Sequence, residues 1–428
     1  MAFRCETCGH RSAKWMGFCP QCGSSEPLAE VAGGARPKVK AAEAIGLTSA
    51  ADQSNDRTMT GWGEIDRVLG GGVVAGSVLL LGGEPGVGKS TLLLQLAGSL
   101  AGRGDSVMVA SAEESAEQVA MRASRLGIVH DAISLVSDDD VDAIVALAER
   151  ERPVLLMIDS IQTVGVPEIG AAPGGVAQVR EAAARLVRLA KTTGVAVVLV
   201  GHVTKDGGLA GPKMLEHMVD VVLYLEGDPD RGFRVLRSTK NRFGATHVSG
   251  MFDMRSEGLT EVEDPSKLFL DGWEPEVPGT VIYPAVEGRR SILVEIQALV
   301  SPTNQAQPRR SIRGLDPTRV NQVLAVLDRH SSLRLHDKEV YVNVVGGWRI
   351  DEPGCDLPVA FAVASSYSDR PLGRLAAWGE IGLAGEVRSI PMEIRRIEEL
   401  DRMGLEIRVA PLGGKPLRLS QALDDAGL

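Results

Sequence analysis

The stretch that decides the fold of this chain is Gly83-Glu84-Pro85-Gly86-Val87-Gly88-Lys89-Ser90-Thr91. It matches G-x-x-x-x-G-K-[ST], follows an apolar run at residues 77–82 and precedes an apolar run with helical spacing. Strand, glycine-rich turn and helix N-terminus therefore follow one another, and backbone N–H groups can approach phosphate oxygens closely. These nine residues predict an ATP site, in which Lys89 reaches the β- and γ-phosphates and the Ser90 hydroxyl binds Mg²⁺.

Strands and helices alternate from this motif onward. We expect strands over residues 77–82, 106–111, 133–136, 153–159, 195–200, 219–225 and 233–239. We expect helices over residues 114–126, 138–150 and 175–193. Repeated strand–helix units predict a mostly parallel sheet with its ligands at the carboxyl ends of the strands.

Polar residues follow three of these strands. Asp159 comes directly after four apolar residues, as expected of a Walker B carboxylate in the Mg²⁺ shell. Glu113 and Glu114 follow the second strand, and we interpret Glu113 as the base that activates water and Glu114 as a helix cap. The reverse assignment stays open. His202 follows the strand at 195–200 and is a candidate sensor of the γ-phosphate, although a lone histidine is more often structural.

Four cysteines fall within the first 22 residues: Cys5, Cys8, Cys19 and Cys22. Their C-x2-C-x10-C-x2-C spacing gives two knuckles, which together form the tetrahedral thiolate site that Zn²⁺ prefers. A segment this short buries too little apolar surface to fold alone, so we expect the metal to supply its folding free energy. Four thiolates leave no open coordination position, which favours a structural zinc over a catalytic one.

The composition is that of an ordinary globular protein, with 428 residues, 44% hydrophobic and 24% charged. Apolar runs such as residues 195–200 are much shorter than the roughly 20 residues that span a bilayer, and no apolar leader follows Met1. We therefore expect a cytoplasmic protein without a membrane partner. A net charge of -10 confines any contact with DNA to local basic surfaces.

The order of P-loop, glutamate, strand-end aspartate and polar sensor resembles the RecA/DnaB class of P-loop ATPases. The stretch Lys240-Asn241-Arg242-Phe243-Gly244, with the cysteine knuckles and the C-terminal part, resembles the bacterial RadA (Sms) family of DNA repair proteins from Cys5 to about residue 410. The resemblance implies a DNA-dependent ATPase that works as a DnaB-like hexameric ring on single-stranded and branched DNA and promotes branch migration. It also implies RecA recombinase and replication proteins as partners.

Lys240 and Arg242 alternate at the end of a predicted strand, so both can point to one side. The resemblance places this pair in the neighbouring subunit's site, where it stabilises charge on the transferred phosphoryl group. The plainer reading is two solvated cations at a strand end.

A second α/β region begins near residue 276. Its Gly379–Val387 stretch resembles the C-terminal fold of Lon proteases. Gly354 or Cys355 stands near the serine position of that family, and Arg395 and Arg396 stand beside the lysine position. Since arginine cannot be deprotonated to serve as a base, we expect a proteolytically inactive Lon-like domain.

The expected domain order is a four-cysteine zinc finger at 1–30, a linker at 31–57, a RecA-like ATPase domain at 58–262, a linker at 263–275 and the Lon-like domain at 276–428. Glycine-rich segments at 165–175 and 204–213 lie where ring translocases carry loops that face DNA. The predicted phosphate contacts are Lys205, Lys213, Arg309, Arg310 and Arg313. Ordinary surface loops and a solvated charge run remain the alternatives.

Two functions fit these residues. One is a motor that couples ATP hydrolysis to movement along DNA. The other is an ATP-switched scaffold that binds DNA and assembles repair proteins without translocating. ATP hydrolysis needs a phosphate-binding lysine, a carboxylate that holds Mg²⁺, a base, and a cationic side chain from the neighbouring subunit. The chain has a candidate for each. This complete set favours the motor.

Overall fold

The computed structural model describes residues 2–8, 10–12, 14–31, 57–170, 174–202, 213–227, 232–305, 307–414 and 417–428. The chain forms two compact units, Met1–Asn55 and Asp56–Leu428. The expected linker at 31–57 lies outside the described residues except at its two ends, residues 31 and 57.

The small N-terminal unit is built on three short strands, β1 (Ala2–Arg4), β2 (Arg11–Ser12) and β3 (Ala29–Val31). Strand β1 pairs antiparallel with both of the others. Its buried core consists of Cys5, Cys19 and Leu28, with Phe3 and Met16 packed against them. A core of this size cannot offset the entropy of ordering the segment, which agrees with a fold that depends on metal.

A nine-stranded sheet forms the first part of the large unit, in the order β14-β13-β12-β11-β6-β10-β9-β7-β8. Six strands are parallel: β6 (Val78–Gly83), β7 (Val107–Ser111), β8 (Ile133–Val136), β9 (Leu155–Asp159), β10 (Ala196–His202) and β11 (Val221–Glu226). Three antiparallel strands extend the edge: β12 (Phe233–Asn241), β13 (Ser249–Arg255) and β14 (Gly258–Glu261).

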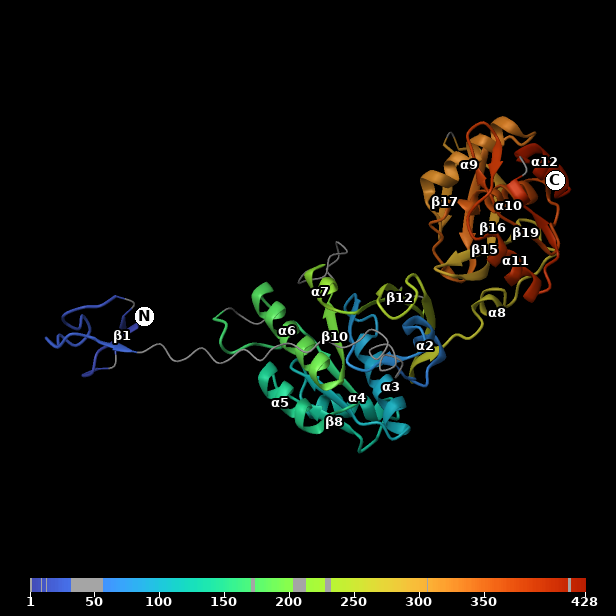
Figure 1. Ribbon diagram of the computed structural model, residues 1–428. Helices are drawn as coiled ribbons and strands as arrows, with labels where there is room; N and C mark the ends of the chain where they lie inside the picture. The colour runs from blue at the N-terminus through green and yellow to red at the C-terminus, as the bar shows by residue number, and fades with distance from the viewer. Residues whose placement is uncertain are drawn as a thin grey trace. The chain divides into compact units, whose positions relative to one another are not determined.

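Helices cover both faces of this sheet, as Figure 1 shows for α3 and α6 on either side of β10. One apolar layer holds side chains of α2 (Gly63–Leu69) and α3 (Lys89–Gly102). The other holds side chains of α5 (Val141–Glu151), α6 (Val176–Thr193) and α7 (Lys213–Met218). Helix α4 (Ala116–Arg125) completes the set, and the strands β4 (Arg57–Thr58) and β5 (Val73–Val74) form a separate pair. The predicted α/β architecture is confirmed.

The C-terminal part contains a six-stranded sheet in the order β17-β18-β16-β15-β19-β22. Its strands are β15 (Thr280–Glu287), β16 (Arg290–Pro302), β17 (Arg310–Arg313), β18 (Lys338–Val344), β19 (Leu375–Ala377) and β22 (Ile407–Val409). A smaller sheet contains β20 (Glu380–Ile381), β21 (Glu386–Arg388) and β23 (Leu417–Arg418). The helices are α9 (Pro317–His330), α10 (Asp356–Ser368), α11 (Glu393–Arg402) and α12 (Leu419–Asp425), and they share one apolar core with the strands.

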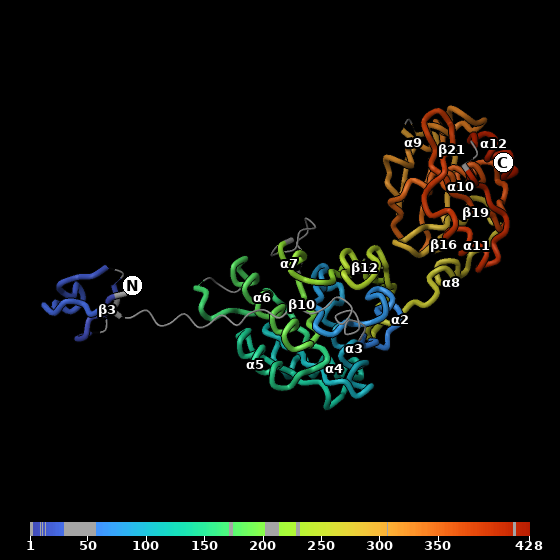
Figure 2. The backbone as a smooth tube through the Cα atoms, viewed as in Figure 1, coloured from blue at the N-terminus to red at the C-terminus, as the bar shows by residue number. Residues whose placement is uncertain are grey.

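The segment at 263–275, expected as a linker, contains the helix α8 (Pro265–Phe269). Asp264 accepts a hydrogen bond from the Lys267 amide as its N-cap, and Pro265 occupies the first helical position. The Asp-Pro pair that suggested a turn is thus a helix start. Phe269 stacks edge-on between Phe233 and Trp348, with ring centroids 5.6 and 5.7 Å away, so the segment is packed structure. Figure 2 follows the backbone through α8 into the C-terminal strands.

Across the described ranges, no helix is both long enough and apolar enough to cross a membrane.

Candidate functional site

The glycine-rich loop joins the end of β6 to the start of α3. Gly88 is the N-cap of α3 and has a φ of +112°, which a side chain would strain. A Cβ atom there would also lie 2.5 Å from the Met254 methyl carbon. The first turn of α3 carries no acidic side chain, so its positive end is open to an anion.

Lys89 is buried at the base of this loop and is 5% exposed. Its Nζ donates hydrogen bonds of 2.9 Å to the carbonyl oxygens of Gly83 and Glu84. Burial lowers the pKa of Lys89, while the charges of Asp159 and Glu113 act in the opposite direction. A partly desolvated ammonium beside two carboxylates and an open helix terminus is suited to bind a polyanion with its metal.

Asp159 and Glu113 come together because β7 and β9 are neighbours in the sheet. Ser111, the last residue of β7, lies opposite Asp159 in the parallel register, and Glu113 follows two residues later. The Ser160 hydroxyl donates a 2.6 Å hydrogen bond to Oε1 of Glu113. Ser160 is fully buried, whereas Glu113 is exposed at this edge. Ser160 was not predicted as a site residue, although its hydroxyl directly follows the strand-end aspartate in the sequence.

Glu114 does not cap the following helix, and that prediction is wrong. The N-cap of α4 is Ser115, which forms a capping box with Gln118 and so satisfies two backbone N–H groups. The Glu114 carboxylate instead forms an ion pair with Arg122 of α4. Glu113 is therefore the glutamate whose carboxylate is held beside the Walker B strand.

Arg242 lies at the opposite end of the sheet from the phosphate loop, and Lys240 lies two residues before it on the chain, level with Leu80 of β6. Lys240 pairs with Val222 across β11 and β12, and β11 runs parallel to β6. The Arg242 amide donates a hydrogen bond to the carbonyl of Asp220. The Asp220 amide in turn donates to the carbonyl of Val78, at the start of β6. Since a strand rises about 3.3 Å per residue, the run from Val78 to Gly83 separates the two ends by roughly 16 Å.

Both cations are bound within their own chain. Lys240 Nζ donates to the carbonyl of Glu216 in α7 at 2.6 Å and to that of Val219, just beyond α7, at 2.8 Å. Arg242 Nη1 donates to Oδ1 of Asp220 at 3.1 Å. Burial lowers the pKa of Lys240, and the neighbouring Arg242 charge acts in the same direction.

The expected contacts with DNA divide into two groups. Lys205 lies outside the described residues, as do the side chains of His202 and Lys213. In the C-terminal part, Arg309 and Arg313 are exposed and line a groove of about 540 Å³. The groove is also lined by polar side chains of the same sheet face, namely Gln297, Ser311, Tyr341 and Asn343.

Arg310 points away from this groove because successive residues of a strand face opposite sides. Its guanidinium donates to the carbonyls of Lys338 and Leu335 at 2.6 and 2.7 Å. Burial lowers the pKa of Arg310. The basic run thus separates into two exposed arginines and one that ties β17 to its neighbour.

Arg396 lies in the interior of the C-terminal part, near the predicted lysine position. It is 1% exposed and donates to the Tyr283 hydroxyl at 3.2 Å and to Oε2 of Glu352 at 2.5 Å. Cys355 is buried nearby, its thiol donates to the Glu352 carbonyl at 3.2 Å, and burial raises its pKa well above the usual range. A protonated thiol beside carboxylates is a poor nucleophile.

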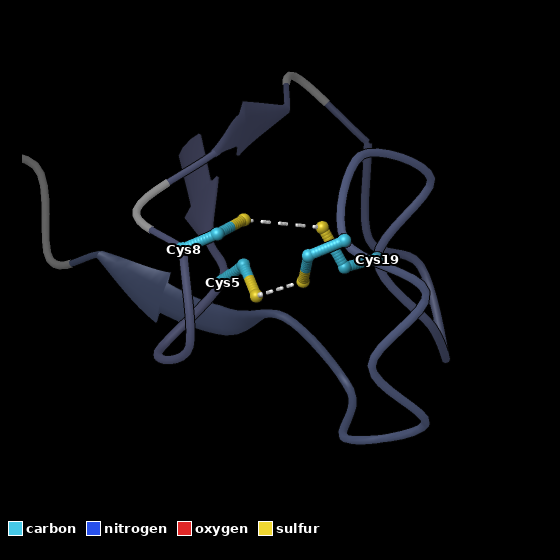
Figure 3. Close-up of side chains that lie close together, drawn as sticks. Cys5, Cys8 and Cys19 are labelled. Carbon is cyan, nitrogen blue, oxygen red and sulfur yellow. Dashed lines mark hydrogen bonds between the residues drawn. The ribbon is translucent and has the colours of Figure 1, made fainter.

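The four N-terminal cysteines bring their sulfur atoms together. Figure 3 shows the thiols of Cys5, Cys8 and Cys19 directed toward one centre. The Cys5–Cys22 and Cys8–Cys19 sulfur separations are 3.7 and 3.6 Å, and all four lie within 4.8 Å of one another. Thiolates about 2.3 Å from a tetrahedral zinc ion would lie roughly 3.8 Å apart. The donor set and its spacing therefore fit zinc.

These features define the class of the protein: a RecA-like P-loop ATPase preceded by a four-cysteine zinc ribbon. Residues 63–208 match a family described as AAA domain, and residues 3–30 match a family described as rubredoxin metal binding domain. The first match supports ATP as a ligand of this chain, and the second supports zinc.

Curated relatives match nearly the whole chain. DNA repair protein RadA of Pseudomonas aeruginosa is 46% identical over 99% of this chain and 98% of its own length. The proteins of the same name from Escherichia coli and Bacillus subtilis are each 44% identical, over 100% and 96% of this chain and 96% and 92% of their own lengths. The chain belongs to the RadA family of DNA repair proteins.

Among solved structures, a KaiC-like protein from the archaeon Pyrococcus horikoshii matches 48% of this chain and 99% of its own length, with a TM-score of 0.41 and 21% identity. The RadB recombinase matches 48% of this chain and 99% of its own length, with a TM-score of 0.39 and 21% identity.

Proposed function

We propose that this protein is a DNA-dependent ATPase that works as a ring-shaped motor on single-stranded and branched DNA and promotes branch migration of recombination intermediates. The observation that carries the proposal is the position of Arg242 at the far end of the sheet from its own phosphate loop. A cation placed there cannot reach its own nucleotide, but it can reach the nucleotide of an adjacent copy. A homo-oligomeric ring, which we take to be hexameric, provides that adjacent copy.

The chemistry of each site falls to a few residues of this chain. Lys89 and the N-terminal turn of α3 bind the phosphates, and Ser90 and Asp159 would hold Mg²⁺. The bound Mg²⁺ neutralises charge on the phosphates. Glu113 accepts the proton of the attacking water, and Ser160 fixes the carboxylate that does so. Arg242 and Lys240 of the neighbour stabilise charge on the transferred phosphoryl group.

We assign contacts with the DNA backbone to Arg309 and Arg313, on the groove-lining face of the C-terminal sheet. Tyr341 lines the same groove and can stack against a base, which suits a single strand. Lys205 and Lys213 stay predicted contacts from the ATPase part. We expect RecA recombinase and replication proteins as partners, and the cytoplasm as the site of action.

We also propose that the Lon-like part is not a protease. Arg396 stands near the position expected of the catalytic lysine, and its guanidinium is fully committed to carbonyl, hydroxyl and carboxylate acceptors in the interior. An arginine cannot lose its proton to activate a nucleophile. This part then serves ring assembly and DNA binding.

The decisive experiment measures ATP hydrolysis with and without single-stranded DNA, together with unwinding of a forked duplex. Stimulated hydrolysis with unwinding supports the motor. DNA binding that depends on ATP, without stimulation or unwinding, identifies the scaffold instead.

The neighbour's role is tested in mixed rings. Lys89→Ala subunits cannot bind phosphate productively but keep Arg242, so they should restore turnover to Arg242→Ala subunits, which keep an intact phosphate loop. Failure of this mixture to recover activity would remove the trans role of Arg242.

A further inference from the structure

A buried carboxylate lies directly behind Arg242. Asp220 is 3% exposed and sits between α7 and β11. Its Oδ1 accepts the 3.1 Å hydrogen bond from Arg242 Nη1. Its Oδ2 accepts bonds from Lys191 Nζ at 2.7 Å and from the Val78 amide at 3.0 Å. Both carboxylate oxygens are thus used.

The backbone of Asp220 is fixed as firmly as its side chain. The Asp220 amide donates to the Val78 carbonyl at 2.8 Å, and the Asp220 carbonyl accepts from the Arg242 amide at 3.1 Å. Asp220 therefore joins the first residue of the phosphate-loop strand to both the backbone and the guanidinium of Arg242. A carboxylate held at so many points has little freedom to follow a moving side chain.

The electrostatics of the cluster keep this carboxylate ionised. Burial acts to raise the pKa of Asp220, but Lys191, the Val78 amide and Arg242 outweigh it, and the pKa is lowered. Lys191 also donates to the Gly76 carbonyl at 3.0 Å, which holds it beside Asp220. One buried negative charge thus faces two cations whose side chains are half exposed, 50% for Lys191 and 56% for Arg242.

We propose that Asp220 is the positioning residue of Arg242. Asp220 engages one of the five N–H donors of the guanidinium and leaves the exposed remainder directed outward for the neighbour's phosphoryl group. Lys191 is the second cation paired with Asp220 and shares its negative charge with Arg242. This inference rests on the proposed trans role of Arg242 and adds the residue that sets its geometry before the neighbour arrives.

The first test is a double-mutant cycle of Asp220→Asn and Arg242→Ala, assayed by DNA-stimulated ATP hydrolysis. Asp220→Asn should lower kcat by about 10²-fold, since misplacing a catalytic group by an ångström costs on that order. The KM for ATP should stay near that of the unaltered protein, because the phosphate loop is intact. In the Arg242→Ala background, Asp220→Asn should have no further effect. Equal losses in both backgrounds would overturn the proposal, because independent effects add.

The second test uses mixed rings. Lys89→Ala subunits keep Asp220 and Arg242, so they should restore turnover to Asp220→Asn subunits, whereas subunits carrying both Lys89→Ala and Asp220→Asn should not. If Lys89→Ala fails to rescue Arg242→Ala, the trans function itself is wrong. If it rescues Arg242→Ala but not Asp220→Asn, Asp220 serves its own subunit's fold or site, and only the positioning role is lost.

Asp253→Asn is the matched control, because Asp253 accepts from Arg255 on β13 and takes no part in this cluster. It should leave kcat unchanged. Removing the buried charge leaves Lys191 without its charged partner, so Asp220→Asn/Lys191→Met provides a charge-balanced variant with the same expected loss. The double-mutant cycle is evaluated with Asp220→Asn or with Asp220→Asn/Lys191→Met, whichever keeps the melting temperature of the unaltered protein. A normal kcat in that variant would refute the proposal.

Discussion

The Ser160 hydroxyl donates a 2.6 Å hydrogen bond to the Glu113 carboxylate across the carboxyl ends of β9 and β7. Glu113 is exposed, and this bond to a buried hydroxyl narrows the range of rotamers that its carboxylate samples. The buried serine therefore selects one position for the proposed base, next to Asp159 in the adjacent strand.

Ser160→Ala should lower the kcat of ATP hydrolysis by about tenfold, a fraction of the roughly 10²–10⁴-fold that a positioned base contributes, and leave the KM for ATP nearly unchanged. Steady-state kinetics over a range of ATP concentrations separates the two constants. Ser160→Thr keeps the hydroxyl and should recover part of the loss. An unchanged kcat in Ser160→Ala would show that the hydrogen bond does not matter for turnover.

Zinc removal should unfold the N-terminal unit alone. Its core holds three buried side chains, two of them cysteines, so a strong chelator removes most of what stabilises it. Circular dichroism and limited proteolysis should report loss of structure before residue 32, while the larger unit keeps its melting temperature. Cys19→Ser should mimic the chelator. A chelated protein whose N-terminal unit resists proteolysis would contradict a metal-dependent fold.

Arg396→Met should destabilise the C-terminal part by roughly 3 kcal/mol, the lower end of the cost of breaking a buried pair, because it leaves the partly buried Glu352 carboxylate without its charged partner. Arg395→Met is the matched control one residue away. Arg395 is half exposed and pairs only with Glu398 among the ion pairs of the described chain, so its loss should change stability by no more than about 0.5 kcal/mol. Chemical denaturation measures the free energy of unfolding of each variant. Equal values for the two variants would refute the structural role of Arg396.

Arg309→Ala/Arg313→Ala should weaken binding of single-stranded DNA and lower the slope of log affinity against log salt by roughly two, one for each lost phosphate contact. Fluorescence anisotropy at several salt concentrations measures that slope. Arg349→Ala removes an exposed arginine that pairs with Asp351 and lies outside the groove face formed by β16, β17 and β18, and it should leave the slope unchanged. An unaltered slope in the double variant would remove this groove from the DNA path.

The pair of Arg402 and Asp264 should make stability depend on pH in the acid range. Hydrogen bonds from the Arg402 guanidinium hold the pKa of Asp264 at about 2, below its ordinary 3.8. A depressed pKa stabilises the fold above pH 4, and this contribution is lost as the pH falls toward 2. Since Arg402 is 44% exposed, screening limits the effect to roughly 1 kcal/mol. Arg402→Met should therefore lower the melting temperature at pH 7 and converge with the unaltered protein near pH 2. A constant difference across this range would contradict the assignment.

The phosphate loop, the strand-end aspartate and the cysteine knuckles were predictable because the residues that define each of them lie close together in the sequence. The six parallel strands were also predicted, since each is a nearly continuous apolar run. Helix α8 was missed because an Asp-Pro pair starts helices as readily as it starts turns.

The cluster around Asp220 could not be read from the sequence. Lys191, Asp220 and Arg242 come from a helix end, a loop and a strand end that are separated by 29 and 22 residues, and only the sheet brings them together. Arg309, Arg310 and Arg313 were predicted as one patch because strand β17 was not recognised. Once that strand is known, its two-residue period assigns Arg310 to the opposite face.

The roughly 16 Å that separate Arg242 from its own phosphate loop have a consequence for how the enzyme is switched on. Under the proposed trans role of Arg242, a solitary chain would carry one part of each of two active sites and would complete neither. Specific activity should then rise with protein concentration and level off once assembly is complete. Dilution alone would then lower the rate of ATP hydrolysis. DNA that brings several subunits together on one strand would raise that rate, even without a conformational change in any subunit.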